Sequence, residues 1–323
     1  MAASYTTGYD EQPIETPPGR LMTFITINDV GPRDGLQNQR KILRPEDRVV
    51  LVKALLASGM KHIEVGAFVS PKAVPAMAGT DQVLAGLKDA DEAVLTVLVP
   101  NFRGYELARD AGAKSVSTVL YGSEGMARAN VRMSRQQADQ ATADILKSAK
   151  DDAIRVTATI AVAFECPFDG PVAPSVVTDT VSRFIELGAD ELAIADTIGA
   201  ANPAQVRSLT DSLVEQHGAG QLSCHFHDTR AMGLANVFAA VESGIRKFDA
   251  SIAGLGGCPF APGASGNVAT EDVVMMLQQM GYDTDIDLSM LMRASALAQE
   301  LTGTAPGGRA RAWLEQQTAI QTI

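Results

Sequence analysis

Two histidines separated by a single residue are the strongest chemical signal in the sequence. His225 and His227 lie in residues 224–228, CHFHD, and the chain has only four histidines. If this segment is a β-strand, alternate side chains point to the same side, so both imidazoles face one way. Packed or surface histidines are the competing interpretation. The pair therefore needs a third ligand before it predicts a metal site.

Asp34 is the candidate for that third ligand. It stands in residues 31–35, GPRDG, directly after an apolar segment and beside Arg33. Two nitrogens and one carboxylate, completed by water and substrate oxygens, suit a divalent ion such as Mn²⁺, Mg²⁺ or Zn²⁺. No thiolate belongs to the set, which argues against a structural zinc site. The sequence predicts a catalytic metal centre on Asp34, His225 and His227.

A glycine-rich segment, residues 254–267, carries a second chemical candidate. Five of its fourteen residues are glycine, which indicates a mobile lid or a backbone that approaches a ligand closely. Cys258 lies in this segment and is a candidate acid or nucleophile, because a thiol near a metal or cation ionises readily. The alternative for a single cysteine is a small buried apolar side chain.

The elements that must position these groups are short apolar segments alternating with helical patterns. We predict eight strands, at residues 22–28, 61–66, 94–99, 115–120, 155–163, 191–195, 221–226 and 247–251. Helical patterns lie between them, with proline near the first position and glycine just after the last turn. Such alternation implies parallel strands joined by right-handed crossovers, and eight of them close most naturally as a (β/α)₈ TIM barrel.

The competing fold, a doubly wound open sheet, would need a glycine-rich phosphate turn after the first strand, and residues 28–35 do not match it. We expect residues 1–20 to form a flexible arm and residues 21–323 a single barrel domain, with extra C-terminal helices near 270–280 and 287–301. In a barrel the site is built at the carboxyl ends of the strands. Other polar residues expected there are Glu64, which could hold Arg33, and the Asp196-Thr197 pair.

Composition limits the class of protein. The net charge of −11 disfavours nucleic acid and anionic membranes as partners, so an anionic substrate needs a local basic patch. Three cysteines cannot form a disulfide framework and fit a reducing compartment. Neither a signal peptide nor an apolar run of the ~18 residues of a spanning helix is evident. We expect a cytoplasmic protein.

Four segments together resemble the hydroxymethylglutaryl-CoA lyase family of TIM-barrel metallolyases. They are residues 30–38 (VGPRDGLQN), 68–72 (FVSPK), 254–259 (GLGGCP) and 263–267 (GASGN), and the resemblance runs from about residue 22 to residue 300. It implies retro-Claisen cleavage of an acyl-CoA to acetyl-CoA, with bound Mg²⁺ or Mn²⁺ (Zn²⁺ in crystals) and a homodimeric assembly.

The resemblance also implies roles for individual residues. Asp34, His225, His227 and Asn267 match the metal ligands. Arg33 matches the cation that stabilises the enolate, with Glu64 as its orienting partner and Cys258 as the acid that protonates the departing enolate. His225 or Asp34 would take the hydroxyl proton, and Asp196 matches a further acidic position. We expect Arg33, Gln37, Thr197 and Arg230 to contact the substrate.

Two departures from the family pattern concern the acyl part of the substrate. Residues 230–233 read RAMG where the family usually has Tyr-Gly-Gln-Ala, and Glu165 stands where a small residue is usual. An added arginine could bind a carboxylate differently. Citramalyl-CoA or a related acyl-CoA is therefore an alternative substrate. A condensing acyltransferase of the same barrel type, or an inactive binding barrel, are further alternatives. The condensing enzymes normally carry a long C-terminal region and this sequence stops at residue 323, so we expect the lyase rather than a condensing enzyme.

Overall fold

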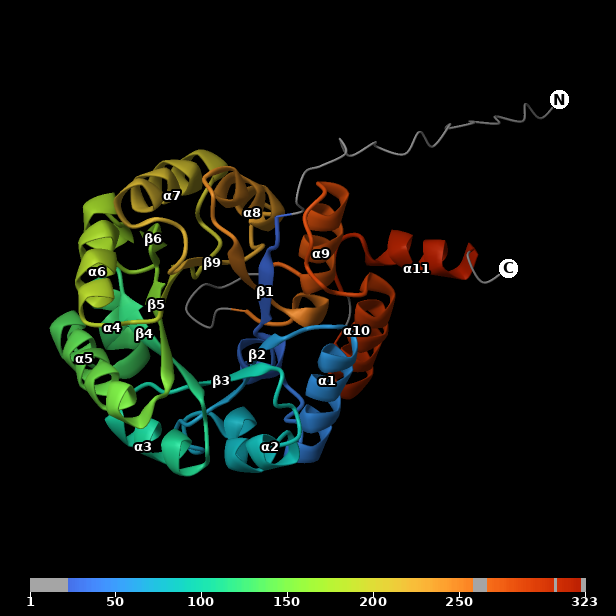
Figure 1. The fold of residues 1–323 in the computed structure, drawn as a ribbon, viewed down its shortest axis with the longest axis horizontal. Coiled ribbons are helices and arrows are strands. Elements are labelled where there is room, and N and C mark those ends of the chain that lie inside the picture. The colour runs from blue at the N-terminus through green and yellow to red at the C-terminus, as the bar shows by residue number, and fades with distance from the viewer. Residues whose placement is uncertain (1–22, 258–265, 305–306, 321–323) are drawn as a thin grey trace.

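The computed structural model describes residues 23–257, 266–304 and 307–320. Its centre is a closed barrel of eight parallel strands surrounded by helices, and Figure 1 looks down the barrel axis. The strands are β1 (Thr26–Asp29), β2 (His62–Ala67), β3 (Val94–Leu98), β4 (Ser115–Tyr121), β5 (Arg155–Ala161), β8 (Glu191–Asp196), β9 (Leu222–Phe226) and β10 (Lys247–Ala250). The predicted TIM barrel is confirmed.

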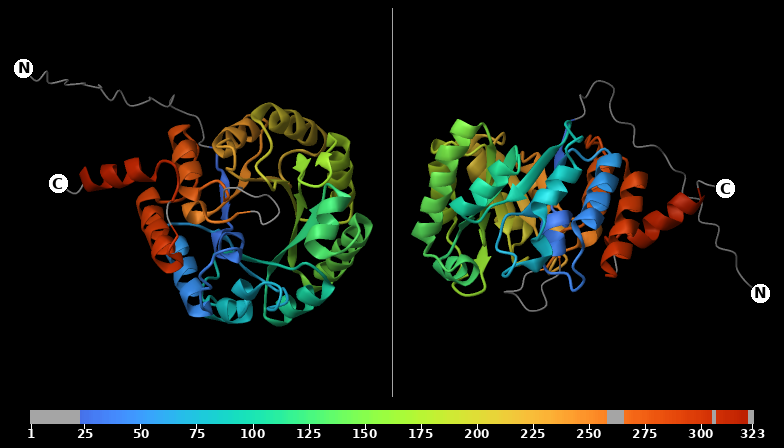
Figure 2. Two further views of the ribbon diagram at one scale, coloured as in Figure 1. Left: turned by 180° about the vertical axis from the view of Figure 1, so that it is seen from behind. Right: turned by 90° about the horizontal axis from the view of Figure 1, so that it is seen from below.

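Each strand is followed by a segment that returns to the start of the next, mostly through a helix. The helices are α1 (Pro45–Ala57), α2 (Thr80–Gly86), α3 (Phe102–Asp110), α4 (Glu124–Val131), α5 (Arg135–Asp152), α6 (Pro174–Glu186), α7 (Pro203–His217) and α8 (Gly233–Glu242). A two-stranded hairpin of β6 (Glu165–Cys166) and β7 (Gly170–Pro171) follows β5. The predicted extra helices are α9 (Thr270–Gln279) and α10 (Leu288–Thr302), and α11 (Arg311–Ile320) extends away from the barrel (Figure 2).

Helix ends follow the signals in the sequence. Proline occupies the first turn of α1, α6 and α7, where its missing N–H costs no hydrogen bond. Four glycines that follow helices have positive φ, between 85° and 100°: Gly59, Gly112, Gly188 and Gly244. Helix α8 begins at Gly233, and Ala231, with φ 56°, interrupts the backbone before it. Residues Gly31–Gly35 form one turn of π-helix, which the sequence did not predict.

The apolar core lies between the strands and the helices, not along the barrel axis. In β1, β5 and β10 the residues that face the helices are buried, and those that face the axis are partly exposed or exposed. Along β5, Val156, Ala158 and Ile160 are buried, whereas Thr157 and Thr159 reach solvent. The apolar packing that stabilises the barrel therefore lies between the strands and the surrounding helices. Within the described residues, no helix has the length and apolarity to cross a membrane.

Candidate metal centre and active site

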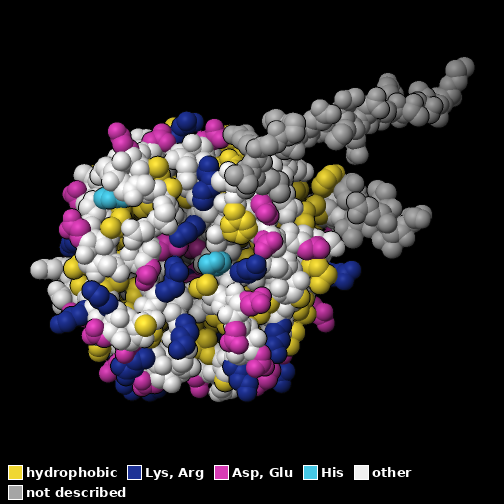
Figure 3. Space-filling view, viewed as in Figure 1, with side chains coloured by type: hydrophobic (Ala, Val, Ile, Leu, Met, Phe, Trp, Pro, Cys, Tyr) yellow, Lys and Arg dark blue, Asp and Glu magenta, His cyan; other side chains and the backbone are white. Residues whose placement is uncertain are grey.

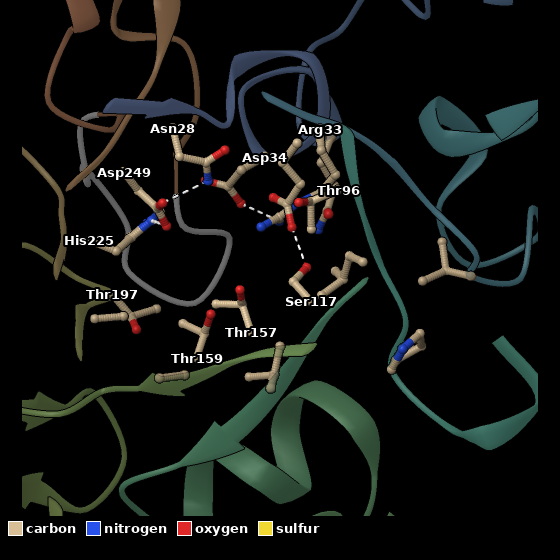
Figure 4. Close-up of a pocket in the computed structure, with 18 of the residues that line it drawn as sticks. Asn28, Arg33, Asp34, Thr96, Ser117, Thr157, Thr159, Thr197, His225 and Asp249 are labelled. Atoms are coloured by element: carbon tan, nitrogen blue, oxygen red, sulfur yellow. Dashed lines mark hydrogen bonds and ion pairs between the residues drawn. The ribbon is translucent and has the colours of Figure 1, made fainter. Parts of the chain in front are cut away.

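The barrel encloses a cavity of about 880 Å³, which is lined by side chains from all eight strands. A barrel axis is normally filled by layers of bulky branched residues. Here many of the residues that face the axis carry hydroxyl or charged groups, and Figure 4 shows Thr96, Ser117, Thr157 and Thr159 around it. The carboxyl ends of the strands form one mouth of this cavity, and most of the predicted site residues gather there.

Asp34, His225 and His227 meet at this mouth, as predicted. One ligand atom from each of the three side chains lies within 4.8 Å of the others. Asp34 belongs to the π-helical turn after β1, and the two histidines lie at the end of β9 and just beyond it. His227 Nε2 is 4.0 Å from Asp34 Oδ2. The arrangement fits a divalent cation bound by two nitrogens and a carboxylate.

Asn267, the predicted fourth ligand, lies beside Asp34. Its side chain is 3% exposed, and its Nδ2 donates to Asp34 Oδ2 at 2.7 Å. Its Oδ1 is buried without a hydrogen-bond partner, and so is Nδ1 of His227. Gly256, with φ 132°, leaves room for this amide, because a Cβ there would lie 2.5 Å from Asn267 Nδ2. Unpaired buried acceptors are rare, so the residues fit a bound cation.

Arg33 is held between two carboxylates. Its Nε donates to Glu64 Oε2 at 2.5 Å and its Nη1 donates to Asp34 Oδ1 at 2.7 Å. Glu64 in turn accepts a hydrogen bond from Ser117 on β4. The guanidinium is therefore fixed at the edge of the predicted metal site, which confirms the expected contact between Glu64 and Arg33. A fixed cation at this place can stabilise negative charge that develops on a substrate.

His225 is positioned by a carboxylate on the next strand. Its Nδ1 lies 3.0 Å from Asp249 Oδ2, and Asn28 Nδ2 donates to Asp249 Oδ1 at 2.8 Å (Figure 4). This hydrogen bond orients the imidazole and leaves Nε2 for a ligand. Sequence reasoning missed both Asp249 and Asn28. The sequence pattern that could have indicated them is a polar residue at every second position of these two strands. The residues are Lys247 and Asp249 on β10, and Thr26 and Asn28 on β1.

Burial and neighbouring charges set the protonation of the site. Burial opposes ionisation of Asp34, but Arg33 and the two imidazoles outweigh it and hold its pKa at about 2. Burial lowers the pKa of His227 to about 4, and His225 adds to the effect, so His227 is neutral as a metal ligand must be. Burial acts the same way on His225, but Asp249 and Asp34 overcome it and raise its pKa.

The remaining predicted residues fall into different places. Gln37 and Thr197 line the cavity, and Thr197 Oγ1 accepts a hydrogen bond from Val162 N at 2.8 Å. Asp196 does not line it: its carboxylate accepts from the N–H groups of Ala200 and Ala201 and so holds the turn after β8.

The two residues that depart from the family pattern also lie away from the cavity. Arg230 is exposed and near enough to Asp196 to act on its charge, and Glu165 lies in the β6–β7 hairpin. Neither is among the described residues that line the cavity. Cys258, the predicted acid, lies outside the described residues.

Comparison with known proteins gives one family. Residues 24–298 match the family model described as HMGL-like. The chain is 42% identical to hydroxymethylglutaryl-CoA lyase of Pseudomonas mevalonii over 298 residues, 92% of this chain and 99% of that protein. It is 43% identical to (R)-citramalyl-CoA lyase of Chloroflexus aurantiacus over 284 residues, 85% of this chain and 90% of that protein.

Solved structures agree with the sequence comparison. A hydroxymethylglutaryl-CoA lyase from Acinetobacter baumannii, solved in complex with coenzyme A and 3-methylmalate, superposes with a TM-score of 0.85 at 36% identity. The superposition covers 89% of this chain and 94% of that one. The barrel and these relatives therefore point to the same chemistry as the geometry of the site.

Proposed function

Because the chain belongs to the HMGL-like family, we propose that it cleaves 3-hydroxy-3-methylglutaryl-CoA to acetyl-CoA and acetoacetate. The chain is a carbon–carbon lyase. The observation that carries this function is the fixed Arg33 beside the cluster of Asp34, His225 and His227. The similarity to hydroxymethylglutaryl-CoA lyase of Pseudomonas mevalonii, which covers 99% of that protein, supports it. Acyl-CoA enters at the mouth formed by the carboxyl ends of the strands.

A divalent cation, Mg²⁺ or Mn²⁺, is part of this proposal. Asp34, His227 and Asn267 would hold it, together with His225 while that imidazole is unprotonated. When bound, the ion polarises the oxygens of the substrate and lowers the pKa of its hydroxyl group. Asp249 and Asn28 keep His225 in place, and Glu64 keeps Arg33 in place, so the polar groups need little rearrangement when the substrate binds.

The residues of the chain divide the chemical step between them. The tertiary hydroxyl loses its proton, the bond between C2 and C3 breaks, C3 becomes the ketone of acetoacetate, and the electron pair passes to the thioester enolate. Asp34 and His225 are the two candidate acceptors of the hydroxyl proton, and both lie at the mouth beside Arg33. Arg33 stabilises the enolate oxygen, and we assign its protonation at C2 to Cys258.

Citramalyl-CoA is the second candidate substrate. The identity to (R)-citramalyl-CoA lyase, 43%, equals that to hydroxymethylglutaryl-CoA lyase within one point, so overall similarity does not separate the two substrates. The same groups would cleave it to acetyl-CoA and pyruvate. Neither Arg230 nor Glu165 lines the cavity, so these departures from the family pattern give no direct reason to prefer this substrate.

A cleavage assay on the purified chain tests the proposal. Acetyl-CoA release would be measured from both acyl-CoA substrates, with Mg²⁺, with Mn²⁺ and after treatment with EDTA. We expect faster release from the hydroxymethylglutaryl ester, loss of activity with EDTA, and recovery with either ion. Faster cleavage of citramalyl-CoA would overturn the substrate, and full activity in EDTA would overturn the role of the metal.

Three finer assignments belong to the same proposal. Cys258→Ser is expected to remove most of the activity, because serine is a much weaker acid than cysteine. Near-normal turnover of that variant would show that another group protonates the enolate. The resemblance to the family further supports a homodimer in the cytoplasm, which sedimentation of the purified chain and fractionation of its host cell would check.

A further inference from the structure

The cavity also reaches the opposite end of the barrel, and charged residues surround it there. His62, Arg155, Glu191 and Lys247 are the first residues of β2, β5, β8 and β10. Parallel strands of a barrel all begin at one face, and all four side chains line the cavity. Figure 3, which shows this face, has basic side chains gathered around the hollow at its centre. We call this opening, with its four residues, the amino-end mouth.

One of the cations at the amino-end mouth is only partly engaged. Lys247 Nζ donates to Glu191 Oε2 and to the carbonyl oxygen of Gly220, each at 3.0 Å. These bonds tie β10 to β8, which is a structural role. An ammonium group has three N–H donors, so one remains for a ligand.

Arg155 has no such role. Its side chain is exposed and makes no hydrogen bond or ion pair with any described residue, although it lies on the strand face that points to the axis. With Lys247 it gives two positive charges against the one negative charge of Glu191. Burial lowers the pKa of His62 and Glu191 raises it, while the charges of Arg155 and Lys247 lower it further. Both cations are therefore close enough to this neutral imidazole to influence it. The mouth has a net positive charge in a chain of net charge −11.

Hydroxyl groups without partners lie deeper in the same passage. Thr157 follows Arg155 by two residues on β5, and Ser223 lines the cavity on β9. Thr26, the first residue of β1, lies beside Lys247 at the mouth itself. Ser223 is 1% exposed, and its Oγ is buried without a hydrogen-bond partner. Two residues along a strand span about 6–7 Å, which matches a carboxylic acid of three to five carbons. A buried unpaired hydroxyl facing a cavity is a position where a ligand oxygen gains a hydrogen bond.

We propose that the amino-end mouth is a second binding site, for a short monocarboxylate that carries a hydroxyl or oxo group. Arg155 and the free N–H of Lys247 bind the carboxylate, and the hydroxyl groups below bind the second oxygen. The site lies at the opposite end of the barrel from Asp34 and the two metal-ligand histidines, and it does not depend on the lyase reaction. It would take the chemical class to which acetoacetate belongs.

Histidine NMR separates the two ends of the barrel in one experiment. The chain has four histidines. His62 reports on the amino-end mouth, and His217 reports on neither end. His225 and His227 report on the mouth formed by the carboxyl ends of the strands, which we call the catalytic mouth. Sodium 3-hydroxybutyrate, which is chemically stable, would be titrated into the Mg²⁺-loaded chain with labelled histidines. We expect the ring signals of His62 to shift and to saturate. Movement of His225 and His227 alone would overturn the proposal, because the acid would then bind only at the catalytic mouth.

Two variants and a second acid make the test specific. Arg155→Gln should lower the affinity for 3-hydroxybutyrate, measured from the saturation of the His62 signal, roughly 10- to 100-fold, as expected for loss of hydrogen bonds to a charged group. Arg207→Gln is the matched control, because Arg207 is an exposed arginine on α7 that pairs with Asp211, and it should leave the titration unchanged. Acetate should bind at least several-fold more weakly than 3-hydroxybutyrate. Equal affinities of wild type and Arg155→Gln would contradict the proposed carboxylate site. Equal affinity for both acids would contradict the role of the hydroxyl groups.

The result is distinguishable from a failure of the proposed lyase. The readout is binding in the absence of any acyl-CoA, so a chain that cleaves neither thioester would still show the His62 shift. Arg155→Gln is also expected to cleave substrate at the wild-type rate, since Arg155 is far along the strand from the reacting atoms. If Arg155→Gln lowered the melting temperature as well as the affinity, Thr157→Val would replace it. That variant leaves the charges intact and should weaken the binding of 3-hydroxybutyrate but not that of acetate.

Discussion

The two faces of the same strands do different work in this barrel. On the outer face of β5, Val156, Ala158 and Ile160 are at most 1% exposed and pack toward the helices. On its inner face, Thr157 and Thr159 reach solvent and line the cavity. Both sets alternate along one seven-residue strand. The outer face is typical of a protein core, whereas the inner face is typical of a binding cleft.

This difference separates the source of stability from the source of activity. Burial of apolar side chains stabilises a fold in rough proportion to the area removed from water, and that area lies on the outer face. Polar groups on the inner face are positioned by hydrogen bonds, such as those of Arg33 with Glu64 and of His225 with Asp249. Substitutions on the two faces should therefore change different measured quantities.

The largest effect is expected in the outer layer. Phe184 on α6 is 0% exposed, so Phe184→Ala leaves a cavity and should lower the free energy of unfolding by about 3–5 kcal/mol. Urea denaturation measures this change. Phe238→Ala on α8 is the control, because Phe238 is 46% exposed and its loss should change stability little. Equal losses in both variants would mean that the core does not lie where we place it.

Next in size is the loss of the fixed guanidinium on the inner face. Arg33→Lys keeps the charge, but an ammonium group cannot reproduce the fork that bonds Glu64 and Asp34 together. We expect kcat to fall about 10²- to 10³-fold, the usual cost of losing a donor that stabilises developing negative charge. Arg44→Lys, at an exposed ion pair, should leave kcat unchanged. Retention of kcat in Arg33→Lys would show that charge alone is sufficient.

A smaller loss is expected when the partner of His225 is changed. Asp249→Asn keeps the shape of the side chain and removes its charge, so the imidazole loses the carboxylate that orients it. Affinity for Mn²⁺ or activity should fall about 10- to 100-fold. Calorimetric titration with Mn²⁺ measures the affinity, with Asp211→Asn on the surface of α7 as the control. An unchanged affinity together with an unchanged kcat would remove Asp249 from the site.

The outer face also contains a carboxyl group whose titration should be visible in stability. Burial raises the pKa of Asp29 to about 7, compared with about 3.9 in an unfolded chain. The folded state therefore holds this proton more tightly, and the free energy of unfolding should fall as the pH rises from about 4 to about 7. In Asp29→Asn that decline should be reduced. Urea denaturation at several pH values measures the two slopes, and parallel slopes would contradict the raised pKa.

The smallest effect compares two neighbouring residues of β5. Ile160→Val and Thr159→Ser each remove one carbon from adjacent side chains on opposite faces. The first should cost about 0.5–1.5 kcal/mol because it leaves a gap in the packed layer. The second should change the free energy of unfolding by less than about 0.5 kcal/mol, since solvent reaches the place of the lost methyl group. A larger cost for Thr159→Ser would reverse the comparison.

The fold was predictable because the turn chemistry of the sequence is consistent. Gly59, Gly112, Gly188 and Gly244 mark helix ends, and each is followed by a strand of the barrel. The site was predictable where a residue type is rare, as in the His225–His227 pair, or where a motif is long, as around Arg33 and Asp34. The ligand position of Asn267 came from the resemblance alone and stays a prediction; its Oδ1 is buried without a hydrogen-bond partner.

The parts that could not be predicted depend on contacts between distant strands. Asp249 and Asn28 are separated by 221 residues, and no local pattern pairs them. The π-helical turn at Gly31–Gly35 positions Asp34, yet its sequence also suits an ordinary loop. Asp196 shows the opposite difficulty: its place after a strand suggested chemistry, whereas its oxygens bind the backbone N–H groups of the following turn.

The wetted barrel axis has a consequence for the response to pressure. Pressure unfolds proteins chiefly because unfolding eliminates dry voids inside them, so the volume change scales with those voids. Water reaches the axis beside Thr157 and Thr159, so the space there is not a void that unfolding would remove. Only the packed layer outside the strands contributes. We therefore expect this barrel to remain folded at pressures that unfold barrels of similar stability with dry cavities along the axis.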